Sequence, residues 1–337
     1  MIRVAINGFG RIGRNAFKIA STKKNIQIVV INDLTDNSTL AHLLRHDSNY
    51  GQYNKVVKSS DKHLYVDGKR ILVTAIPEVE KLPWKENKID VVIESTGRFT
   101  THEDLQKHLK AGAKTVVLSA PEKGENKDTF VIGANAEKLS ITNKIISNAS
   151  CTTNCIAPIM AILSKTIGIE KSLMTTVHSY TQSQQLQDGP GRDLREARAA
   201  AENIVPTSTG AATAAALTVP ELKGKFDGLS IRVPTPVVSI SDITFLAKKN
   251  TSIEDINKEL IKASHSTHKG IISYTQEELV SSDFIGDPHS CIVDLNLTNV
   301  VDGNLCKVVA WYDNEWGYSN RLVEMVQLVD ANIKKGG

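Results

Sequence analysis

The sequence has 337 residues, 41% of them hydrophobic, which is enough for two domains with substantial cores. Its 40 basic and 37 acidic residues are spread along the chain and leave a net charge of +3, so we expect neither a nucleic-acid-binding arm nor an acidic tail. The sequence has no apolar run that approaches a membrane span, and its first residues lack the pattern of a secretory signal, so we expect a cytoplasmic protein that needs no membrane or nucleic-acid partner.

The chain opens with a pattern typical of dinucleotide binding. An apolar alternation over residues 2–6 predicts a strand, a glycine-rich turn follows, and residues 15–24 predict a helix. The turn contains Gly8, Gly10 and Gly13 in Gly-x-Gly-x-x-Gly spacing. We expect the first glycine to permit the tight turn, the second to let a pyrophosphate approach the backbone, and the third to allow close packing of helix and strand.

A second strand favours NAD as the cofactor. Residues 26–31 form an apolar run that ends at Asn32 and Asp33, and Asp33 lies twenty positions beyond Gly13. A carboxylate at this point accepts hydrogen bonds from a ribose 2′-hydroxyl and repels a 2′-phosphate, while Leu34 offers that phosphate no donor. The pattern therefore predicts NAD in preference to NADP, and a purely structural glycine turn is the weaker interpretation.

The same alternation continues and predicts an α/β Rossmann-type domain. Further strands are expected at residues 90–94 and 115–118, a helix at 101–109, and an Asp-Gly hairpin within 65–73. Ligands of such sheets lie beyond the carboxyl ends of the strands, so we expect the loops that begin at Ser95 and Ser119 to follow the cofactor. Polar residues in these loops serve equally well as helix caps.

The six residues Ser-Cys-Thr-Thr-Asn-Cys at positions 150–155 place a cysteine where a strand ends and a helix begins. Residues 144–147 predict the strand, and Ser150 suits the N-cap of a helix that starts at Cys151 and runs to about residue 165. Unpaired N–H groups and the helix dipole favour an anion there, so the Cys151 thiol tends toward the nucleophilic thiolate. The alternative is a small buried side chain that serves packing.

The other cysteines are expected to be structural. On a regular helix the Cβ atoms of Cys151 and Cys155 lie about 5–6 Å apart, whereas a disulfide needs about 3.8 Å. No second pair of ligands completes a zinc site, so we expect no metal. Cys291 and Cys306 fall in separate strand-like segments, where packing explains them better than chemistry.

After residue 150 the hydrophobic pattern predicts an α+β catalytic domain with a mostly antiparallel sheet. Expected strands lie at residues 173–177, 229–233, 237–245, 291–297 and 305–311, and expected helices at 151–166, 210–217 and 252–264. We therefore predict an NAD-binding domain over residues 1–150 and a catalytic domain over residues 151–314.

Two groups of residues in the second half carry candidate chemistry. His178 ends an apolar strand 27 residues after Cys151, which makes contact between them plausible, although a structural imidazole is the alternative. Arginine forks and helix-start N–H groups both favour phosphate, and a solvated surface is the other interpretation of the arginines. The arginines are Arg192, Arg195, Arg198 and Arg232, and the Thr-Ser-Thr-Gly segment at residues 207–210 lies between them.

Five motifs, taken together and in order, closely resemble the phosphorylating glyceraldehyde-3-phosphate dehydrogenases. They are Asn-Gly-Phe-Gly-Arg-Ile-Gly-Arg at 7–14, the hexapeptide at 150–155, His-Ser-Tyr-Thr at 178–181, Pro-Thr-Ser-Thr-Gly-Ala-Ala at 206–212 and Trp-Tyr-Asp-Asn-Glu-Trp-Gly-Tyr at 311–318. The resemblance runs from residue 1 to about residue 330, and the hexapeptide is highly specific to this family.

The resemblance implies an NAD-dependent oxidation of glyceraldehyde 3-phosphate that consumes inorganic phosphate and yields 1,3-bisphosphoglycerate. Cys151 would form a thiohemiacetal and then a thioacyl intermediate, with His178 as base and as imidazolium partner of the thiolate. The resemblance also implies a homotetramer and a C-terminal helix, about residues 315–337, that packs back onto the NAD-binding domain.

The resemblance assigns further residues to ligands. Thr181 and Arg232 would bind the substrate phosphate, and Ser150, Thr152, Thr209 and Gly210 the attacking phosphate. Asn314 would orient the nicotinamide carboxamide, Tyr318 would lie beside the ring, and Arg11, Ile12, Asp33 and Ser119 would follow the rest of NAD.

Two places depart from the family pattern: position 196, and residues 74–78, which lack the arginine that often lies near the adenine there. Glu196 occupies a place where bacterial relatives often carry an arginine associated with phosphate, and Arg195 or Arg198 would have to compensate. A near alternative is therefore erythrose-4-phosphate dehydrogenase, in which water replaces phosphate as the second nucleophile. A catalytically silent NAD-binding interaction protein is the other alternative, and the presence of the whole set of motif residues disfavours it.

Overall fold

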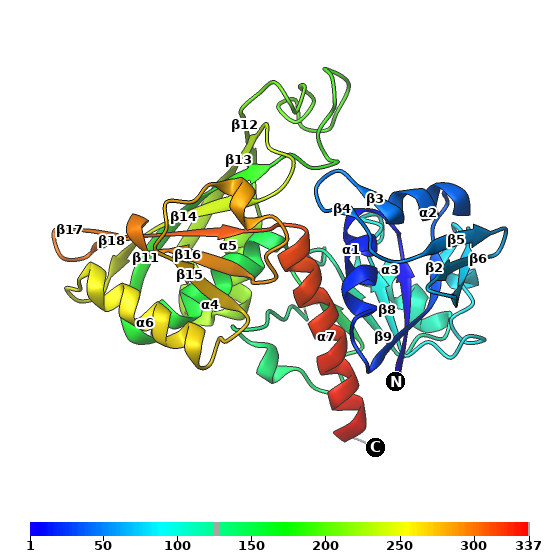
Figure 1. Cartoon of the computed structure of the whole chain (residues 1–337). Coiled ribbons are helices and arrows are strands. Elements are labelled where there is room, and N and C mark those ends of the chain that lie inside the picture. The colour runs from blue at the N-terminus through cyan, green and yellow to red at the C-terminus, as the bar shows by residue number, and fades with distance from the viewer. Residues whose placement is uncertain (125–127, 336–337) are drawn as a thin grey trace. The chain divides into compact units, whose positions relative to one another are not determined.

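The computed structural model describes residues 1–124 and 128–335, which form two compact units, each with its own large β-sheet (Figure 1). Unit 1 comprises Met1–Phe130, Glu137–Ala149 and the chain from Ser319 onward, and unit 2 comprises Val131–Ala136 and Ser150–Tyr318. Within the described ranges, no helix combines the length and the apolar character needed to cross a bilayer.

Unit 1 alternates strands and helices along most of its length. Its strands are β1 (Ile2–Asn7), β2 (Ile26–Asn32), β3 (His46–Asp47), β4 (Gly51–Gln52), β5 (Val57–Ser60), β6 (His63–Val66), β7 (Lys69–Thr74), β8 (Val91–Glu94), β9 (Thr115–Leu118) and β10 (Ile145–Ser147). Its helices are α1 (Arg11–Ala20), α2 (Asn37–Arg45), α3 (His102–Lys110) and all but the first turn of α7 (Trp316–Lys335).

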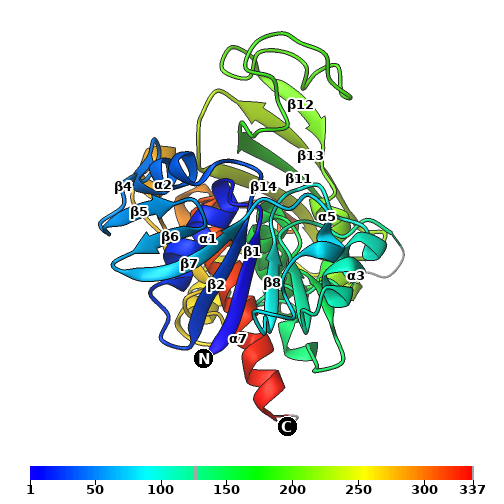
Figure 2. The same ribbon diagram turned by 90° about the vertical axis from the view of Figure 1, so that its right-hand side faces the viewer.

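The main sheet of unit 1 has the strand order β10-β9-β8-β1-β2-β7-β6-β5. The strands from β10 to β7 are parallel, and Figure 2 shows β7, β2, β1 and β8 side by side. The chain passes from β1 to β2 on one side and reaches β8 on the other, so the strand order reverses between β1 and β8. The crevice beyond the carboxyl ends at such a reversal is where nucleotides bind in Rossmann-type folds.

The predicted hairpin is confirmed. Strands β6 and β7 pair in antiparallel fashion around Asp67 and Gly68, whose φ angles of +48° and +76° are the left-handed values of a type I′ turn. Strand β5 extends this hairpin. The sequence patterns missed β5 because three of its four side chains are exposed and polar, which leaves no apolar alternation to detect.

The predicted helix over residues 15–24 was wrong at both ends. Helix α1 begins directly after Gly10, which leaves no room for the longer turn that we expected. It ends at Ala20, after which the N–H groups of Thr22 and Lys23 donate to carbonyl oxygens only three residues back, those of Ile19 and Ala20, at 3.0 Å each. Periodicity alone does not reveal such a local bond.

Unit 2 is an α+β structure, as the sequence predicted. Its helices are α4 (Cys151–Thr166), α5 (Ala211–Thr218) and α6 (Ile253–His265). Its strands are β11 (Ile169–Ser179), β12 (Val205–Ser208), β13 (Phe226–Val233), β14 (Ser239–Ala247), β15 (Ile272–Thr275), β16 (Cys291–Asp294), β17 (Asn299–Val301) and β18 (Leu305–Tyr312).

The sheet of unit 2 has the order β12-β13-β11-β14-β18-β16-β15, with β17 also paired to β18. Only the pairs β11–β13 and β15–β16 are parallel among these strands, so the prediction of a mostly antiparallel sheet is confirmed. The strand expected at residues 291–297 ends at Asp294 instead. A 3₁₀ turn, η5 (Leu295–Leu297), follows it, and the Asn257 amide donates to the Leu295 carbonyl there at 3.2 Å.

Helix α4 lies at the centre of unit 2. Residues from Thr152 to Leu163 are all buried, and the helix contacts α5, α6 and four strands of the sheet. A helix that is covered on every side is apolar on every side, which explains its lack of a polar face. Cys155, Cys291 and Cys306 are buried free thiols, as the packing interpretation predicted.

Helix α7 begins at Trp316, within one residue of the expected start at about residue 315. The Asp313 carboxylate accepts the backbone N–H groups of Glu315 and Trp316 and so caps the helix at that point. Within unit 1, Gln327 of α7 donates to the Asn25 side chain at 2.9 Å. That bond ties the C-terminal helix to the turn that precedes β2.

Candidate active site

The glycine turn of unit 1 has the steric form that a pyrophosphate needs. Gly8 has a φ of +91°, and a Cβ atom there would lie 2.6 Å from the backbone nitrogen of Thr96. A Cβ on Gly13 would lie 2.1 Å from the carbonyl oxygen of Gly8, whereas one on Gly10 would meet nothing within 4 Å. The first and third glycines are therefore required by packing, and the second faces open space that a ligand can fill.

The start of α1 has a form that suits an anion. Gly10 precedes the helix and has no side chain to cap it, and the N–H groups and dipole at the start of a helix favour a phosphate. The Asp33 carboxylate accepts the N–H groups of Phe9 at 2.7 Å and Thr35 at 2.9 Å, which anchors the turn to the end of β2. Arg11 forms an ion pair with the buried Asp47 at 2.8 Å.

The other predicted cofactor residues of unit 1 follow the strand ends. Ile12 is partly exposed in the first turn of α1, and Ser119 is partly exposed directly after β9. The backbone N–H of Ser119 donates to the carbonyl oxygen of Glu94 at 2.9 Å, which holds the ends of β8 and β9 together. These positions fit a ligand that lies across the carboxyl edge of the sheet.

Unit 2 brings the predicted nucleophile and base together. Cys151 occupies the first position of α4, directly after Ser150, whose hydroxyl caps the helix by accepting the N–H of Thr153 at 3.0 Å. His178 lies near the end of β11, and its Nε2 atom is 3.4 Å from the Cys151 Sγ atom. A thiol in this contact with an imidazole can transfer its proton to the ring.

Burial shifts the pKa values of Cys151 and His178 in the directions that disfavour the expected thiolate and imidazolium. Burial raises the pKa of the Cys151 thiol, against the lowering effects of Arg232 and the Thr152 donors. Burial, together with the charge of Arg232, lowers the pKa of His178 to about 3. Loss of water around a charged group costs free energy, so burial opposes both the thiolate and the imidazolium.

Two groups compete for the Nδ1 atom of His178. The Ser179 carbonyl oxygen lies 2.7 Å away and accepts a proton from Nδ1, whereas the Arg232 Nη1 atom lies 2.6 Å away and donates one to it. One ring nitrogen cannot do both, so the two contacts belong to different protonation forms. With Arg232 as donor the ring proton sits on Nε2, and with Ser179 as acceptor Nε2 is free to act as base.

Tyr312 is a buried residue of this site that the sequence analysis did not single out. Its Oη atom lies 2.9 Å from the Thr152 hydroxyl and 2.8 Å from the Thr176 hydroxyl, and its ring stands edge-on to that of His178. The Thr152 hydroxyl is thus engaged inside the core, so the group that Thr152 can best offer an anion is its backbone N–H. The motif at 311–318 marked Tyr312 as a family feature but gave no reason for it.

Asn314 has a defined orientation. Its side-chain oxygen accepts the hydroxyl groups of Ser179 at 2.9 Å and Ser239 at 3.2 Å. The amide NH₂ is therefore the donor end, which suits the carbonyl of a carboxamide ligand. Tyr318 is buried in the first turn of α7.

The predicted phosphate residues are distributed along two segments. The Thr181 hydroxyl lies 3.1 Å from that of Ser183, and the Thr209 hydroxyl accepts the N–H of Ala211 at 3.2 Å. Gly210 precedes α5 with no side-chain cap, which leaves helix-start donors there.

The departure at Glu196 has a structural partner. Its carboxylate accepts the Thr207 hydroxyl at 3.1 Å. Arg198, one of the two residues expected to compensate, forms an ion pair with Asp188 at 2.7 Å on the exposed surface. Arg195 is exposed as well. The hydrogen bond from Thr207 thus holds the negative charge of Glu196 beside Thr207, which is close in sequence to the predicted phosphate-binding residues Thr209 and Gly210.

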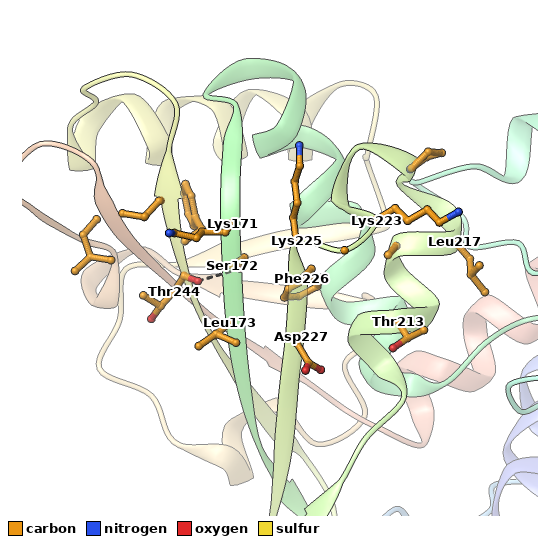
Figure 3. A pocket seen from close by; sticks show the side chains of 16 residues that line it. Lys171, Ser172, Leu173, Thr213, Leu217, Lys223, Lys225, Phe226, Asp227 and Thr244 are labelled. Atoms are coloured by element: carbon orange, nitrogen blue, oxygen red, sulfur yellow. Dashed lines mark hydrogen bonds between the residues drawn. The ribbon is translucent and has the colours of Figure 1, made fainter.

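A further cavity of unit 2 lies elsewhere. It has a volume of about 970 Å³ and is lined by β11, β13 and β14 together with the end of α5, with Lys171, Leu173, Lys223 and Lys225 around it (Figure 3). None of the predicted site residues lines it. Over the described part of the chain, no cluster of His, Cys, Asp and Glu side chains is arranged to hold a metal ion.

Comparisons with known proteins match both units. Residues 2–102 match the family model described as glyceraldehyde 3-phosphate dehydrogenase, NAD binding domain, and residues 150–314 match the one described as the C-terminal domain. The glyceraldehyde-3-phosphate dehydrogenase of Geobacillus stearothermophilus is 50% identical over 329 residues, 97% of this chain and 98% of the relative. That of Mycolicibacterium smegmatis is 51% identical over 340 residues, covering 98% and 99%. Glyceraldehyde-3-phosphate dehydrogenase 2 of Trichormus variabilis is 52% identical over 333 residues, covering 98% of each.

Proposed function

Because the chain belongs to the glyceraldehyde-3-phosphate dehydrogenase family, we propose that it oxidises D-glyceraldehyde 3-phosphate with NAD and inorganic phosphate to 1,3-bisphosphoglycerate. The contact of 3.4 Å between Cys151 Sγ and His178 Nε2 at the start of a buried helix carries the proposal. NAD is the cofactor, in agreement with the family model for residues 2–102 and with the steric form of the glycine turn.

The reaction proceeds in two stages on Cys151. His178 Nε2 takes the thiol proton as Sγ bonds to the aldehyde carbon, and it returns that proton to the aldehyde oxygen to give a thiohemiacetal. Bound NAD supplies the hydride acceptor. As the carbon loses its hydride, His178 removes the hydroxyl proton and a thioester remains on Cys151. An oxygen of inorganic phosphate then attacks the thioester carbon, and the departing Cys151 sulfur recovers a proton from His178.

Through Arg232, the substrate phosphate determines which ring nitrogen of His178 carries the proton. While its guanidinium donates to Nδ1 at 2.6 Å, the ring proton occupies Nε2 and the imidazole cannot take the thiol proton. A phosphate bound by Arg232 and Thr181 draws the guanidinium away, because a charge-assisted bond to an anion is stronger than one to a neutral ring. The ring proton then moves from Nε2 to Nδ1, where it is donated in a hydrogen bond to the Ser179 carbonyl oxygen, and Nε2 becomes the base.

Phosphate dependence tests the second stage. NADH formation from glyceraldehyde 3-phosphate is measured with and without inorganic phosphate, and we expect sustained turnover only in its presence. Full turnover without phosphate would refute the proposal and favour water as the second nucleophile, as in an erythrose-4-phosphate dehydrogenase. The family match and the near-complete coverage of relatives do not favour that enzyme or a silent NAD-binding protein.

The remaining expectations belong to the same proposal. The chain acts in the cytoplasm as a homotetramer, with an NAD-binding domain at residues 1–150 and a catalytic domain at 151–314. Exposed leucines support self-association: Leu173, Leu217 and Leu305 are 41–66% exposed and line the cavity of Figure 3. Light scattering of the purified protein at several concentrations measures the oligomeric state, and a persistent monomer would refute this part.

A further inference from the structure

A network of buried polar side chains lies beneath the glycine turn, and the mechanism above makes no use of it. Its centre is Glu94, which ends β8 and has no exposed surface. One carboxylate oxygen accepts the Asn7 amide at 2.6 Å and His108 Nε2 at 3.0 Å. The other accepts the backbone N–H of Thr96 at 2.8 Å and the Thr96 hydroxyl. Four donors therefore converge on two oxygens.

The neighbours of His108 fix its tautomer. The Trp84 indole N–H points at Nδ1 from 3.0 Å, and an indole nitrogen can only donate. Nδ1 must then accept, so the ring proton sits on Nε2 and is directed at Glu94. His108 is thus a neutral donor to the carboxylate, and both His108 and Trp84 are completely buried. Only the ionised carboxylate accepts all four hydrogen bonds, because a protonated carboxyl group would point its own O–H at one of the four donors.

Glu94 connects the two chain segments that enclose Gly8. Asn7 directly precedes Gly8, and the backbone of Thr96 lies so close to Gly8 that a Cβ atom would be 2.6 Å from its nitrogen. Asn32, at the end of β2, donates to the Asn7 side-chain oxygen at 2.8 Å and extends the network to a third strand. The carboxylate therefore sits at the point where the strand order reverses, between β1 and β8.

We propose that Glu94 is a positioning residue for NAD, which acts through Asn7 and Thr96 to hold the glycine turn in its ligand-ready form. His108 and Trp84 keep the carboxylate in the one orientation that serves both segments. A turn that is ordered in advance loses less conformational freedom when the cofactor binds, and this lowers the dissociation constant. Only a carboxylate can accept hydrogen bonds from both chain segments, because an amide has one accepting oxygen.

The test compares Glu94→Gln with a destabilised control. Whichever way the glutamine amide turns, its NH₂ group faces at least one fixed donor, the Thr96 N–H on one side or Asn7 and His108 on the other, so the turn must shift. Leu64→Ala is the control, because Leu64 is fully buried on β6, with β1, β2 and β7 between it and Glu94. Titration calorimetry well below the melting temperature should show about a tenfold rise in the NAD dissociation constant for Glu94→Gln and no change for Leu64→Ala at a similar loss of Tm.

Steady-state kinetics separate positioning from general damage. Glu94→Gln should raise the KM for NAD and leave kcat at saturating NAD close to the wild-type value, because Glu94 touches no reacting atom. Thr96→Val, which keeps the backbone donor and removes one hydroxyl, should give a smaller rise and decides the matter if Glu94→Gln does not fold. Unchanged NAD affinity in the folded variants, or an equal loss in Leu64→Ala, would overturn the proposal.

Discussion

Replacing Arg232 with glutamine should make Cys151 more reactive toward an alkylating agent while it impairs turnover. Arg232 Nη1 lies 2.6 Å from His178 Nδ1, and the Cys151 Sγ atom lies 3.4 Å beyond the far nitrogen of the same ring. The guanidinium is therefore nearer to the imidazole than to the thiol. Its charge lowers the pKa of both groups, so it opposes the imidazolium and favours the thiolate.

The Arg232 charge affects the imidazolium more than the thiolate, because it lies nearer to the His178 ring than to the Cys151 sulfur. With an effective dielectric constant of about 20, a unit charge at roughly 4 Å costs the imidazolium about 4 kcal/mol, and one at roughly 8 Å stabilises the thiolate by about 2 kcal/mol. The difference, about 2 kcal/mol against the ion pair, corresponds to a factor of about 30 in its population. Arg232→Gln should therefore accelerate alkylation by iodoacetamide near neutral pH by about one order of magnitude.

The direction of the change in alkylation rate tests whether Arg232 and the Ser179 carbonyl compete for His178 Nδ1. Loss of a cation beside a cysteine ordinarily slows alkylation, so equal or slower alkylation of Arg232→Gln would refute the competition for Nδ1. Arg198→Gln is the matched control, since Arg198 belongs to the same unit but pairs with Asp188 on the exposed surface. That variant should keep the wild-type rate. Turnover of glyceraldehyde 3-phosphate should fall in Arg232→Gln alone, because only Arg232 is assigned to the substrate phosphate.

Three further substitutions test other parts of the site. Cys151→Ser should abolish NADH formation and leave NAD affinity unchanged by calorimetry, and residual dehydrogenase activity would exclude Cys151 as the nucleophile. Tyr312→Phe strips the shared partner from the Thr152 and Thr176 hydroxyls and should lower the free energy of unfolding by about 1–3 kcal/mol in urea titrations; wild-type stability would contradict that bridge. Glu196→Arg should lower the KM for inorganic phosphate about three- to tenfold, and an unchanged value would mean that this position does not affect phosphate.

Sequence patterns predicted the helix ends that are set by neighbouring residues in the sequence. Helix α4 begins at Cys151 and ends at Thr166, as expected, because Ser150 supplies a cap that the sequence displays. Helix α1 ends instead where the N–H groups of Thr22 and Lys23 turn to carbonyl oxygens three residues back, and the sequence shows no cap at that point. Strand β5 carries mostly polar, exposed side chains, so its pairing with β6 is a tertiary effect with no period to detect.

The residue types of the candidate site were predictable from motifs, but their contacts were not. Sequence spacing suggested that His178 might reach Cys151, since a strand and a helix start can meet at such a separation. It gave no sign that Arg232 contacts Nδ1 or that Glu94 collects four donors. Those contacts depend on burial and on chain segments that are distant in sequence, and the same burial raises the pKa of Cys151 and lowers that of His178.

The two buried histidines show how one geometry can serve opposite purposes. In His108 the Trp84 indole points at Nδ1, and Nε2 faces the Glu94 carboxylate. In His178 the Arg232 guanidinium points at Nδ1, and Nε2 faces the Cys151 thiol. The indole donor is neutral and can only donate, so Nδ1 accepts and His108 donates permanently to Glu94 through Nε2. The guanidinium is charged, an anion can attract it, and the Ser179 carbonyl lies ready to accept the Nδ1 proton. A fixed tautomer therefore suits the scaffold of the nucleotide turn, and an exchangeable one suits a base that should act only when a phosphorylated substrate is present.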